Sequence, residues 1–274
     1  MITVILRGGL GNQMFEYAAG LNLALKKKTQ LVLDTTYLND RSPRRDFTHR
    51  DYDLDVFRVA PKFTTFSKIS SAVPIPGVWL GLDFGWCAMK RMCGNEVLWG
   101  YYQGEKYFVE HKDAVRTAFE FREPLTGEAA AIALKIKQGN SISLHVRRGD
   151  YVLPKYQKLY GDTNTAYYDR AIAHMANAVK SPEFFIFSDD IAWCREHIKP
   201  PFPTTYADDA SRGPKAAFHL ELMSLAKHNI IANSSFSWWG AWLNANPQKI
   251  VVAPKQWEVA HVGDDIVPER WVRL

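Results

Sequence analysis

Two adjacent arginines beside a histidine are the first residues in the chain that could do chemistry. They follow an apolar run in the stretch SLHVRRGDY, where His145, Arg147 and Arg148 precede Gly149 and Asp150. A guanidinium group keeps its charge at any working pH and can donate two parallel N–H bonds to a phosphate. The stretch therefore predicts a diphosphate site, and an ion pair between either arginine and Asp150 is the structural alternative.

A serine-rich turn supports the same kind of site. The stretch NSSFSWWGAW places Asn233, Ser234, Ser235 and Phe236 where an apolar strand passes into a helix. Backbone N–H groups at the start of a helix bind anions, and neighbouring hydroxyls add further donors. Capping of the helix by Ser234 or Ser235 is the alternative. The tryptophans that follow have helical spacing, which favours a place in the core.

A pair of aspartates follows another apolar run, in the stretch FSDD, which contains Ser188, Asp189 and Asp190. A carboxylate there can accept the two neighbouring donors of a guanine base or bind a ribose diol. A magnesium site is the competing interpretation, but the arginine pair already supplies the cation that a diphosphate needs, so we expect no metal. Capping of the next helix by one of the two aspartates is the structural alternative.

The glycines near the start of the chain do not form the dinucleotide fingerprint. In GGLGNQM, Met14 stands where the motif G-x-G-x-x-G requires its last glycine. Gly9 and Gly11 still allow a ligand to approach the backbone closely, and Asn12 opens the next helix, where it could face the cleft. A tight turn with an asparagine cap is the alternative.

All four motifs follow predicted strands, in a chain where strands alternate with helices. The first half predicts strands at 2–6 and 31–34, helices at 13–28 and 107–121, and an exposed charged loop or short helix at 40–58. The second half predicts strands at 141–146, 183–187, 204–208, 229–232 and 249–254, and helices at 165–179, 190–198, 214–228 and 237–245. Such alternation implies parallel sheets covered on both faces, which bind ligands beyond the carboxyl ends of the strands.

We therefore expect an α/β protein with two Rossmann-like halves that face a cleft. The boundary is placed near Glu123 and Pro124, which gives an N-terminal domain at 1–123 and a C-terminal domain at 124–274.

Composition narrows the class of partner. The 274 residues carry 34 basic and 29 acidic side chains, a net charge of +5. This favours a small anionic ligand, and the absence of a long basic tract argues against nucleic acid. Three cysteines without a metal-binding spacing predict reduced thiols. No apolar run approaches the roughly 20 residues of a membrane helix.

Together the motifs resemble the α-1,2-fucosyltransferases of glycosyltransferase family eleven. GGLGNQMFEYAAG, HVRRGDY, FSDDIAWC and NSSFSWWGAWL occur in that family's order across positions 8–243. The resemblance implies a GT-B-like fold whose donor site lies mainly in the second half, so the acceptor surface is expected in the first domain, in the region of residues 40–58. It also implies transfer of fucose from GDP-β-L-fucose to the 2-hydroxyl of a terminal β-galactoside, with inversion and without an essential metal or other cofactor.

The resemblance also assigns roles to residues. Arg147 is the arginine most closely tied to the β-phosphate and, with Asn12, is expected in the catalytic site. Asp150 is the first candidate for a general base, and Glu16 is the second. Donor binding is expected from His145, Arg147, Arg148, Ser188, Asp189, Asp190, Asn233, Ser234, Ser235, Phe236, Gly9 and Gly11.

The animal members of that family carry a membrane anchor, whereas this chain begins at its first strand. We therefore expect a soluble bacterial form in the cytoplasm, with peripheral attachment to the inner membrane as the alternative. Three other functions stay open. They are fucosyl transfer with another linkage, a nicotinamide-dependent oxidoreductase, suggested by Asp34 at the end of the second strand, and a non-catalytic glycan-binding protein, suggested by the aromatic residues.

Overall fold

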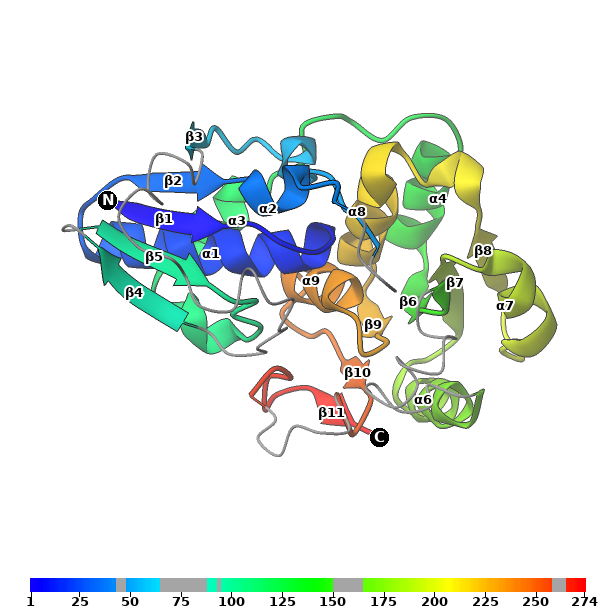
Figure 1. The fold of residues 1–274 in the computed structure, drawn as a ribbon. Helices are drawn as coiled ribbons and strands as arrows, with labels where there is room; N and C mark the ends of the chain where they lie inside the picture. The colour runs from blue at the N-terminus through cyan, green and yellow to red at the C-terminus, as the bar shows by residue number, and fades with distance from the viewer. Residues whose placement is uncertain (43–47, 65–87, 93–94, 150–164, 258–264) are drawn as a thin grey trace. The chain divides into compact units, whose positions relative to one another are not determined.

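The computed structural model describes residues 1–42, 48–64, 88–92, 95–149, 165–257 and 265–274 (Figure 1). The chain forms two compact units, Met1–Arg122 and Glu123–Leu274. Each unit contains its own sheet with packed helices, so the α/β class is confirmed. Across the described residues, every helix is too short or too polar to cross a bilayer.

The sheet of the first unit is mixed rather than wholly parallel. Its strand order is β3-β2-β1-β5-β4. The strands are β1 (Ile2–Ile5), β2 (Leu31–Asp34), β3 (Lys62–Thr64), β4 (Ala88–Met92) and β5 (Asn95–Trp99). The pair β4–β5 is antiparallel, which corrects the expectation of a parallel sheet. Only two residues separate these strands, too few for the crossover that a parallel pair needs.

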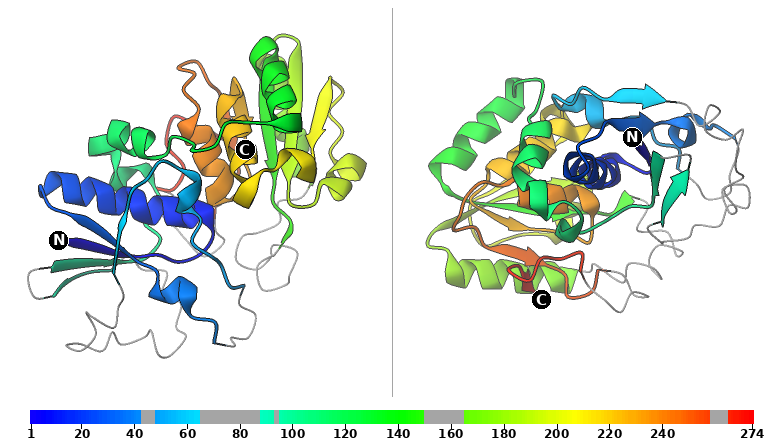
Figure 2. Two further views of the ribbon diagram at one scale, coloured as in Figure 1. Left: turned by 90° about the horizontal axis from the view of Figure 1, so that it is seen from above. Right: turned by 90° about the vertical axis from the view of Figure 1, so that its left-hand side faces the viewer.

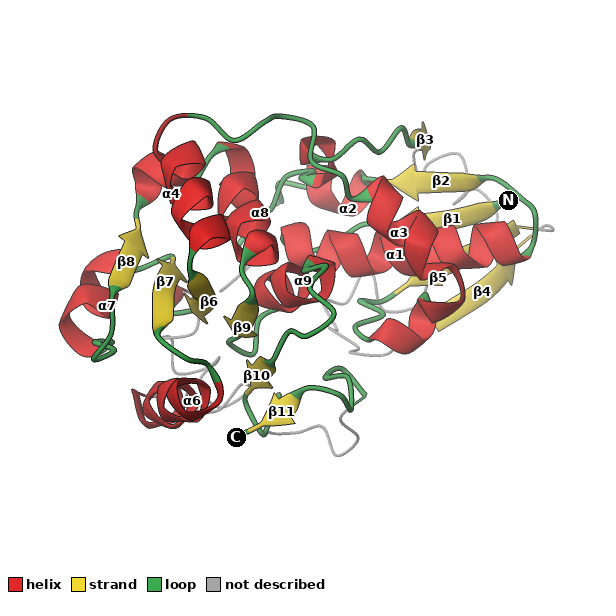
Figure 3. Ribbon diagram, turned by 180° about the vertical axis from the view of Figure 1, so that it is seen from behind, coloured by secondary structure: helices red, strands yellow, loops and turns green. Residues whose placement is uncertain are grey.

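The helices of the first unit differ from the expectation at their ends. They are α1 (Leu10–Lys26), α2 (Thr36–Asn39) and α3 (Lys112–Ala118), with 3-10 turns η1 (Leu54–Val56), η4 (Glu105–Tyr107) and η5 (Val109–His111). Figure 3 shows α1 and α3 on the same face of the sheet. The prediction of one continuous helix at 107–121 is therefore wrong. The region 40–58 is not fully exposed either, because Leu54 and Phe57 are buried.

The sheet of the second unit is parallel throughout the described strand pairs. Its order is β11-β10-β9-β6-β7-β8. The strands are β6 (Asn140–Val146), β7 (Pro182–Ser188), β8 (Thr204–Ala207), β9 (His228–Ile230), β10 (Val251–Ala253) and β11 (Val272–Arg273). Val146 lies opposite Ser188, so β6 and β7 end side by side.

Helices cover both faces of this second sheet. They are α4 (Gly127–Gln138), α6 (Thr165–Ala178), α7 (Ile191–His197), α8 (Ala217–Leu225) and α9 (Ser235–Leu243), with 3-10 turns η7 (Asp209–Ser211) and η8 (Pro214–Ala216). In the right-hand view of Figure 2, α6 and α4 lie on opposite faces. Helix α4 was not predicted from the sequence.

Alternation along β6 divides its side chains between the two faces. Ile142, Leu144 and Val146 pack into a buried cluster with side chains of α6 and α7. His145 points to the other face, where its ring meets Phe236 of α9. The expected core position of the tryptophans is confirmed. Trp238, Trp239 and Trp242 of α9 are at most 1% exposed.

Gly20 allows α1 to pack closely on its sheet. A Cβ atom at this position would overlap the stiff side chain of Val4 and lie 2.9 Å from Leu31 Cδ1. We predict that Gly20→Ala lowers the free energy of unfolding by about 1–3 kcal/mol, because β-branched Val4 cannot turn aside cheaply. Chemical denaturation measures this change. The control is Gly9→Ala, because a Cβ atom there would meet no atom of the described residues within 4 Å. Equal stability of both variants would contradict the prediction.

Candidate functional site

Charged and polar side chains gather where β6, β7 and β9 end in the second unit. Arg147 and Arg148 follow β6, and Asp189 and Asp190 follow β7. Strand β9, on the other side of β6, leads to the serine turn that precedes α9. The parallel order of these three neighbouring strands brings all three loops to one edge of the sheet, where such sheets bind ligands.

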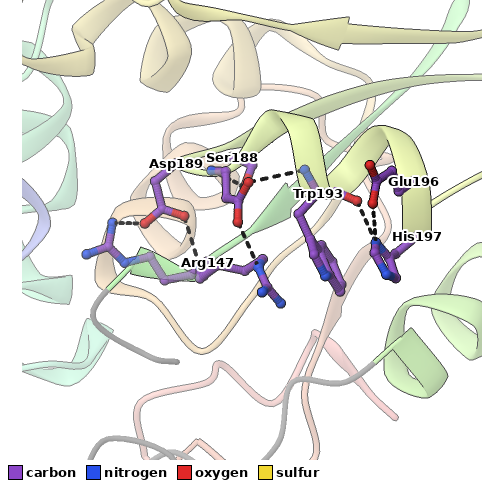
Figure 4. A network of polar contacts seen from close by, with 8 residues as sticks. Arg147, Ser188, Asp189, Trp193, Glu196 and His197 are labelled. Atoms are coloured by element: carbon purple, nitrogen blue, oxygen red, sulfur yellow. Dashed lines mark hydrogen bonds and ion pairs between the residues drawn. The ribbon is translucent and has the colours of Figure 1, made fainter. Parts of the chain in front are cut away.

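An ion pair between Arg147 and Asp189 joins the first two loops (Figure 4). Arg147 Nη1 lies 2.6 Å from Asp189 Oδ2, and the two side chains are 26% and 17% exposed. Gly149 makes room for this pair. A Cβ atom on Gly149 would lie 2.5 Å from Asp189 Oδ2 and 3.6 Å from Arg147 Cζ. The guanidinium of Arg147 is therefore held in place at the edge of the sheet.

Arg148 contacts both aspartates. Its backbone N donates to Asp189 Oδ1 at 2.9 Å, and its Nε donates to Asp190 Oδ2 at 3.1 Å. Asp190 Oδ1 accepts a bond from Trp193 N, so Asp190 caps α7. This confirms the expected cap. Figure 4 shows the network. The proposed partner Asp150 lies outside the described residues.

Both aspartates thus contact arginines through their carboxylate oxygens. Each of these oxygens keeps a second lone pair for another donor, so the contacts with the arginines leave room for a bond from a guanine base or a ribose. The assignment of the aspartates to such a ligand stays a prediction. Ser188 supports the same turn, since its Oγ accepts a bond from Asp190 N. Within the described ranges, no three His, Cys, Asp or Glu side chains come together as metal ligands would.

His145 is a buried, neutral histidine beside the ion pair. It is 6% exposed, and its ring centroid lies 5.7 Å from that of Phe236. The pKa of His145 is lowered to about 3, mainly by burial; Asp189 opposes this shift, whereas Arg147 contributes to it. Its Nδ1 has no hydrogen-bond partner among the residues that the structure describes. His145 therefore adds no positive charge to the site near neutral pH.

The serine turn precedes α9. Ser234 occupies the N-cap position, but its side chain makes no capping bond, so capping by the Ser234 hydroxyl is not found. Instead, Ser237 Oγ donates to Ser234 O at 3.2 Å. At the other end of α9, Lys249 Nζ donates to the carbonyls of Ala241 and Asn244. The helix thus carries a cation at its carbonyl end, which complements its dipole.

The remaining predicted residues lie beside the serine turn of the second unit and at the start of α1 in the first unit. Asn233, next to the serine turn, is 1% exposed, and its Nδ2 donates to Trp257 O at 3.4 Å. In the first unit Gly9 is the N-cap of α1, and Gly11 lies in its first turn. Asn12 also lies inside the helix, so the structural alternative of an asparagine cap is not found. Asn12 Oδ1 accepts a bond from Gln103 Nε2 at 2.8 Å.

Gln13 has a positioning role that the sequence analysis missed. It is fully buried, and its Nε2 donates to the carbonyls of Gly8 and Asp51 at 2.9 and 2.7 Å. Its Oε1 accepts a bond from Asp53 N. Gln13 therefore ties the glycine loop to the segment 51–53. No local pattern predicts this contact, because the partners are about 40 residues apart.

Glu16 forms a buried ion pair with Arg7 in the first unit. Its Oε2 accepts a bond from Arg7 N at 2.8 Å, and both side chains are at most 3% exposed. Burial raises the pKa of Glu16 well above its ordinary value, although Arg7 opposes the shift. The guanidinium of Arg7 lies 4.4 Å from the ring centroid of Tyr101 and 4.8 Å from that of Trp99. Glu16, the second candidate for a base, thus binds Arg7 inside the unit.

Two α/β units with polar loops after their strands define a GT-B-like glycosyltransferase fold. A crystal structure of NodZ, an α-1,6-fucosyltransferase co-crystallised with GDP, superposes with a TM-score of 0.52. The superposition covers 88% of this chain and 91% of NodZ at 14% identity, so it shows the fold alone. Residues 90–274 match the model of glycosyl transferase family 11. The chain belongs to this family.

Relatives along the whole chain agree with the family match. The O-antigen biosynthesis glycosyltransferase WbnK of Escherichia coli is 33% identical, over 98% of this chain and 99% of its own length. An α-1,2-colitosyltransferase of Escherichia coli is 32% identical, over 100% of this chain and 99% of its own length. The mouse galactoside 2-α-L-fucosyltransferase Sec1 is 26% identical, over 89% of this chain and 64% of its own length.

Gly149 should tolerate no side chain while Asp189 is present. We predict that Gly149→Ala lowers the free energy of unfolding by about 1–3 kcal/mol, because the added Cβ displaces the carboxylate from Arg147. The same substitution in an Asp189→Ala background should cost much less, since the overlapping atom is gone. Urea denaturation of the four proteins measures both effects. An equal cost in the two backgrounds would show that the overlap with Asp189 is not the cause.

Two buried histidines should make the protein less stable in acid. Burial lowers the pKa of His145 to about 3 and of His219 to about 4. An unfolded histidine titrates near pH 6.5, so between pH 6.5 and 4 the unfolded chain binds more protons, and stability falls as the pH falls. At pH 5 each histidine should cost up to about 2 kcal/mol relative to pH 8.

The measurement compares the free energy of unfolding at pH 8 and pH 5 in the wild type, His145→Gln and His219→Gln. Each variant should lose part of the pH dependence, because it lacks one of the groups. The comparison isolates the histidines from the buried carboxyls, whose raised pKa values act in the opposite direction. Variants with the same pH dependence as the wild type would refute the assignment.

Proposed function

We propose that this protein transfers L-fucose from GDP-β-L-fucose to the 2-hydroxyl of a terminal galactose. The observation that carries the proposal is Arg147, held by Asp189 beside Gly149 at the edge of a parallel sheet. A fixed guanidinium at that edge suits a diphosphate. The names of the relatives support the transferred sugar and the linkage, because they include an α-1,2-colitosyltransferase and a galactoside 2-α-L-fucosyltransferase.

The main catalytic task is to stabilise the departing GDP. Arg147 neutralises charge on the diphosphate as the bond to the sugar breaks, and the N-terminus of α9 adds backbone donors. Hydrogen bonds to charged groups contribute roughly 1.5–3 kcal/mol each. The sugar becomes oxocarbenium-like, and the acceptor hydroxyl attacks from the opposite face, which inverts the anomeric centre. In this mechanism the arginine replaces a metal ion.

We assign the acceptor to the first unit. The glycine loop begins α1 there, and Asn12 is partly exposed in its first turn. An amide cannot act as a base, but it can orient the attacking hydroxyl. Asp150 stays the first candidate for the base because it lies only two residues after Arg148 in the sequence. With GDP as a good leaving group, a weak base suffices.

Colitose is the second candidate for the transferred sugar. The bacterial α-1,2-colitosyltransferase matches the full length of this chain, whereas the mouse fucosyltransferase matches 89% of it at lower identity. Colitose lacks the 3-hydroxyl of L-fucose, so the two sugars differ by one hydrogen-bonding group. A site built to bind that hydroxyl would reject colitose strongly.

The test incubates the protein with GDP-L-fucose or GDP-colitose and a panel of β-galactosides, followed by linkage analysis of the product. We predict an α-1,2-linked product with fucose. Arg147→Ala should lower kcat/KM by about 10²–10³-fold or more at an unchanged fold, because the leaving-group charge is no longer neutralised. The control is Arg195→Ala, an arginine of α7 that lies over Tyr206.

Each outcome separates one function from the others. A product that contains colitose would show that colitose, and not fucose, is the transferred sugar. A different linkage would show that another hydroxyl of the acceptor is attacked. Glycan binding without transfer would support a carbohydrate-binding protein. Thermal protection by NAD but not by GDP would support an oxidoreductase. Near-wild-type turnover by a folded Arg147→Ala protein would overturn the role of Arg147.

A further inference from the structure

We infer that Arg148 is a positioning residue, which fixes the loop after β6 through Asp190 and Trp193 and thereby orients Arg147. It is not a second contact to the diphosphate. This inference rests on the proposed function, since it concerns the donor site of the same reaction. It gives the two adjacent arginines different tasks.

The guanidinium of Arg148 is already committed to α7. Its Cζ lies 3.9 Å from the ring centroid of Trp193, and its Nε donates to Asp190 Oδ2 at 3.1 Å. A planar cation so close to an indole ring makes a strong cation–π contact. The ion pair and the stacking hold the guanidinium from two directions, so its plane is fixed.

The indole ring of Trp193 is itself held in place. The ring of His197 stacks on it at 4.4 Å with an interplanar angle of 7°, and His197 Nδ1 contacts Trp193 O at 2.9 Å. Figure 4 shows the rings of Trp193 and His197 side by side. Trp193 also packs against the buried cluster of the second unit. The stack of three side chains therefore rests on the core.

The two aspartates connect this stack to Arg147. Asp190 binds Arg148 with one oxygen and caps α7 at Trp193 N with the other. Asp189 accepts a bond from the backbone N of Arg148 with Oδ1 and binds Arg147 with Oδ2. A displacement of Arg148 therefore moves the backbone that Asp189 binds, and with it the carboxylate that orients Arg147.

The test measures GDP affinity by calorimetry for the wild type, Arg148→Lys, Trp193→Leu and the double variant. Lysine keeps the charge but loses the planar stacking and the Nε bond. Each single variant should weaken GDP binding by roughly 3- to 10-fold, and the double variant should be no weaker than the poorer single one, because both break the same stack. Trp193→Phe keeps an aromatic ring and should therefore retain most of the GDP affinity that Trp193→Leu loses.

Arg195→Lys is the matched control, since Arg195 of α7 lies 5.0 Å from the ring centroid of Tyr206 and touches neither aspartate in the contacts described above. It should leave GDP affinity unchanged. Thermal unfolding of each variant tests whether Arg148 and Trp193 are merely structural. In that case the substitutions would lower the melting temperature and leave the GDP affinity of the folded protein intact.

Three results would overturn the inference. They are multiplicative losses in the double variant, wild-type affinity in Arg148→Lys, and a loss of stability alone. Multiplicative losses would show that Arg148 contacts the diphosphate directly. Wild-type affinity in Arg148→Lys would show that the stacking of Arg148 is dispensable for GDP binding. Failure of the wild type to bind GDP is a separate result, because it would refute the proposed function before any variant is compared.

Discussion

The parallel register between β6 and β7 is the constraint on which the charged edge of the second unit depends. Val146 lies opposite Ser188, so two arginines and two aspartates leave neighbouring strands at the same level. Parallel strands lie about 4.8 Å apart, a separation at which unpaired charges of one sign would repel strongly. A slip of one residue would turn each side chain to the other face. The register therefore determines which arginine meets which aspartate.

The sequence was sufficient to predict features that depend on local pattern. Strands β6 to β10, the polar loops after β6, β7 and β9, the cap of α7 by an aspartate and the buried tryptophans all follow from periodicity and from residue type, whereas β11 was not predicted. The GT-B-like class followed from the resemblance of the motifs and agrees with the superposed NodZ structure. Strand order was not predictable in this way, because nothing in FSDD or HVRRGD specifies that the two strands are neighbours.

Other features escaped prediction for two different reasons. Helix α4 had a usable signal, since Ala129, Ile132, Ala133 and Ile136 have helical spacing and are buried; it was overlooked. The antiparallel pair β4–β5 and the contacts of Gln13 had no such signal. They join segments whose own patterns are weak, and only the packed chain shows that a buried amide side chain links the glycine loop to residues 51–53.

Gly149 has a consequence for how this protein can evolve. The space that a methyl group would occupy there is filled by a carboxylate oxygen of Asp189. The two positions are 40 residues apart in the chain, yet neither can drift alone. A lineage that gains a side chain at 149 must shorten or redirect the residue at 189, and the arginine then needs another counter-ion. Covariation of these two positions would thus be a trace of the ion pair in the sequences of descendants.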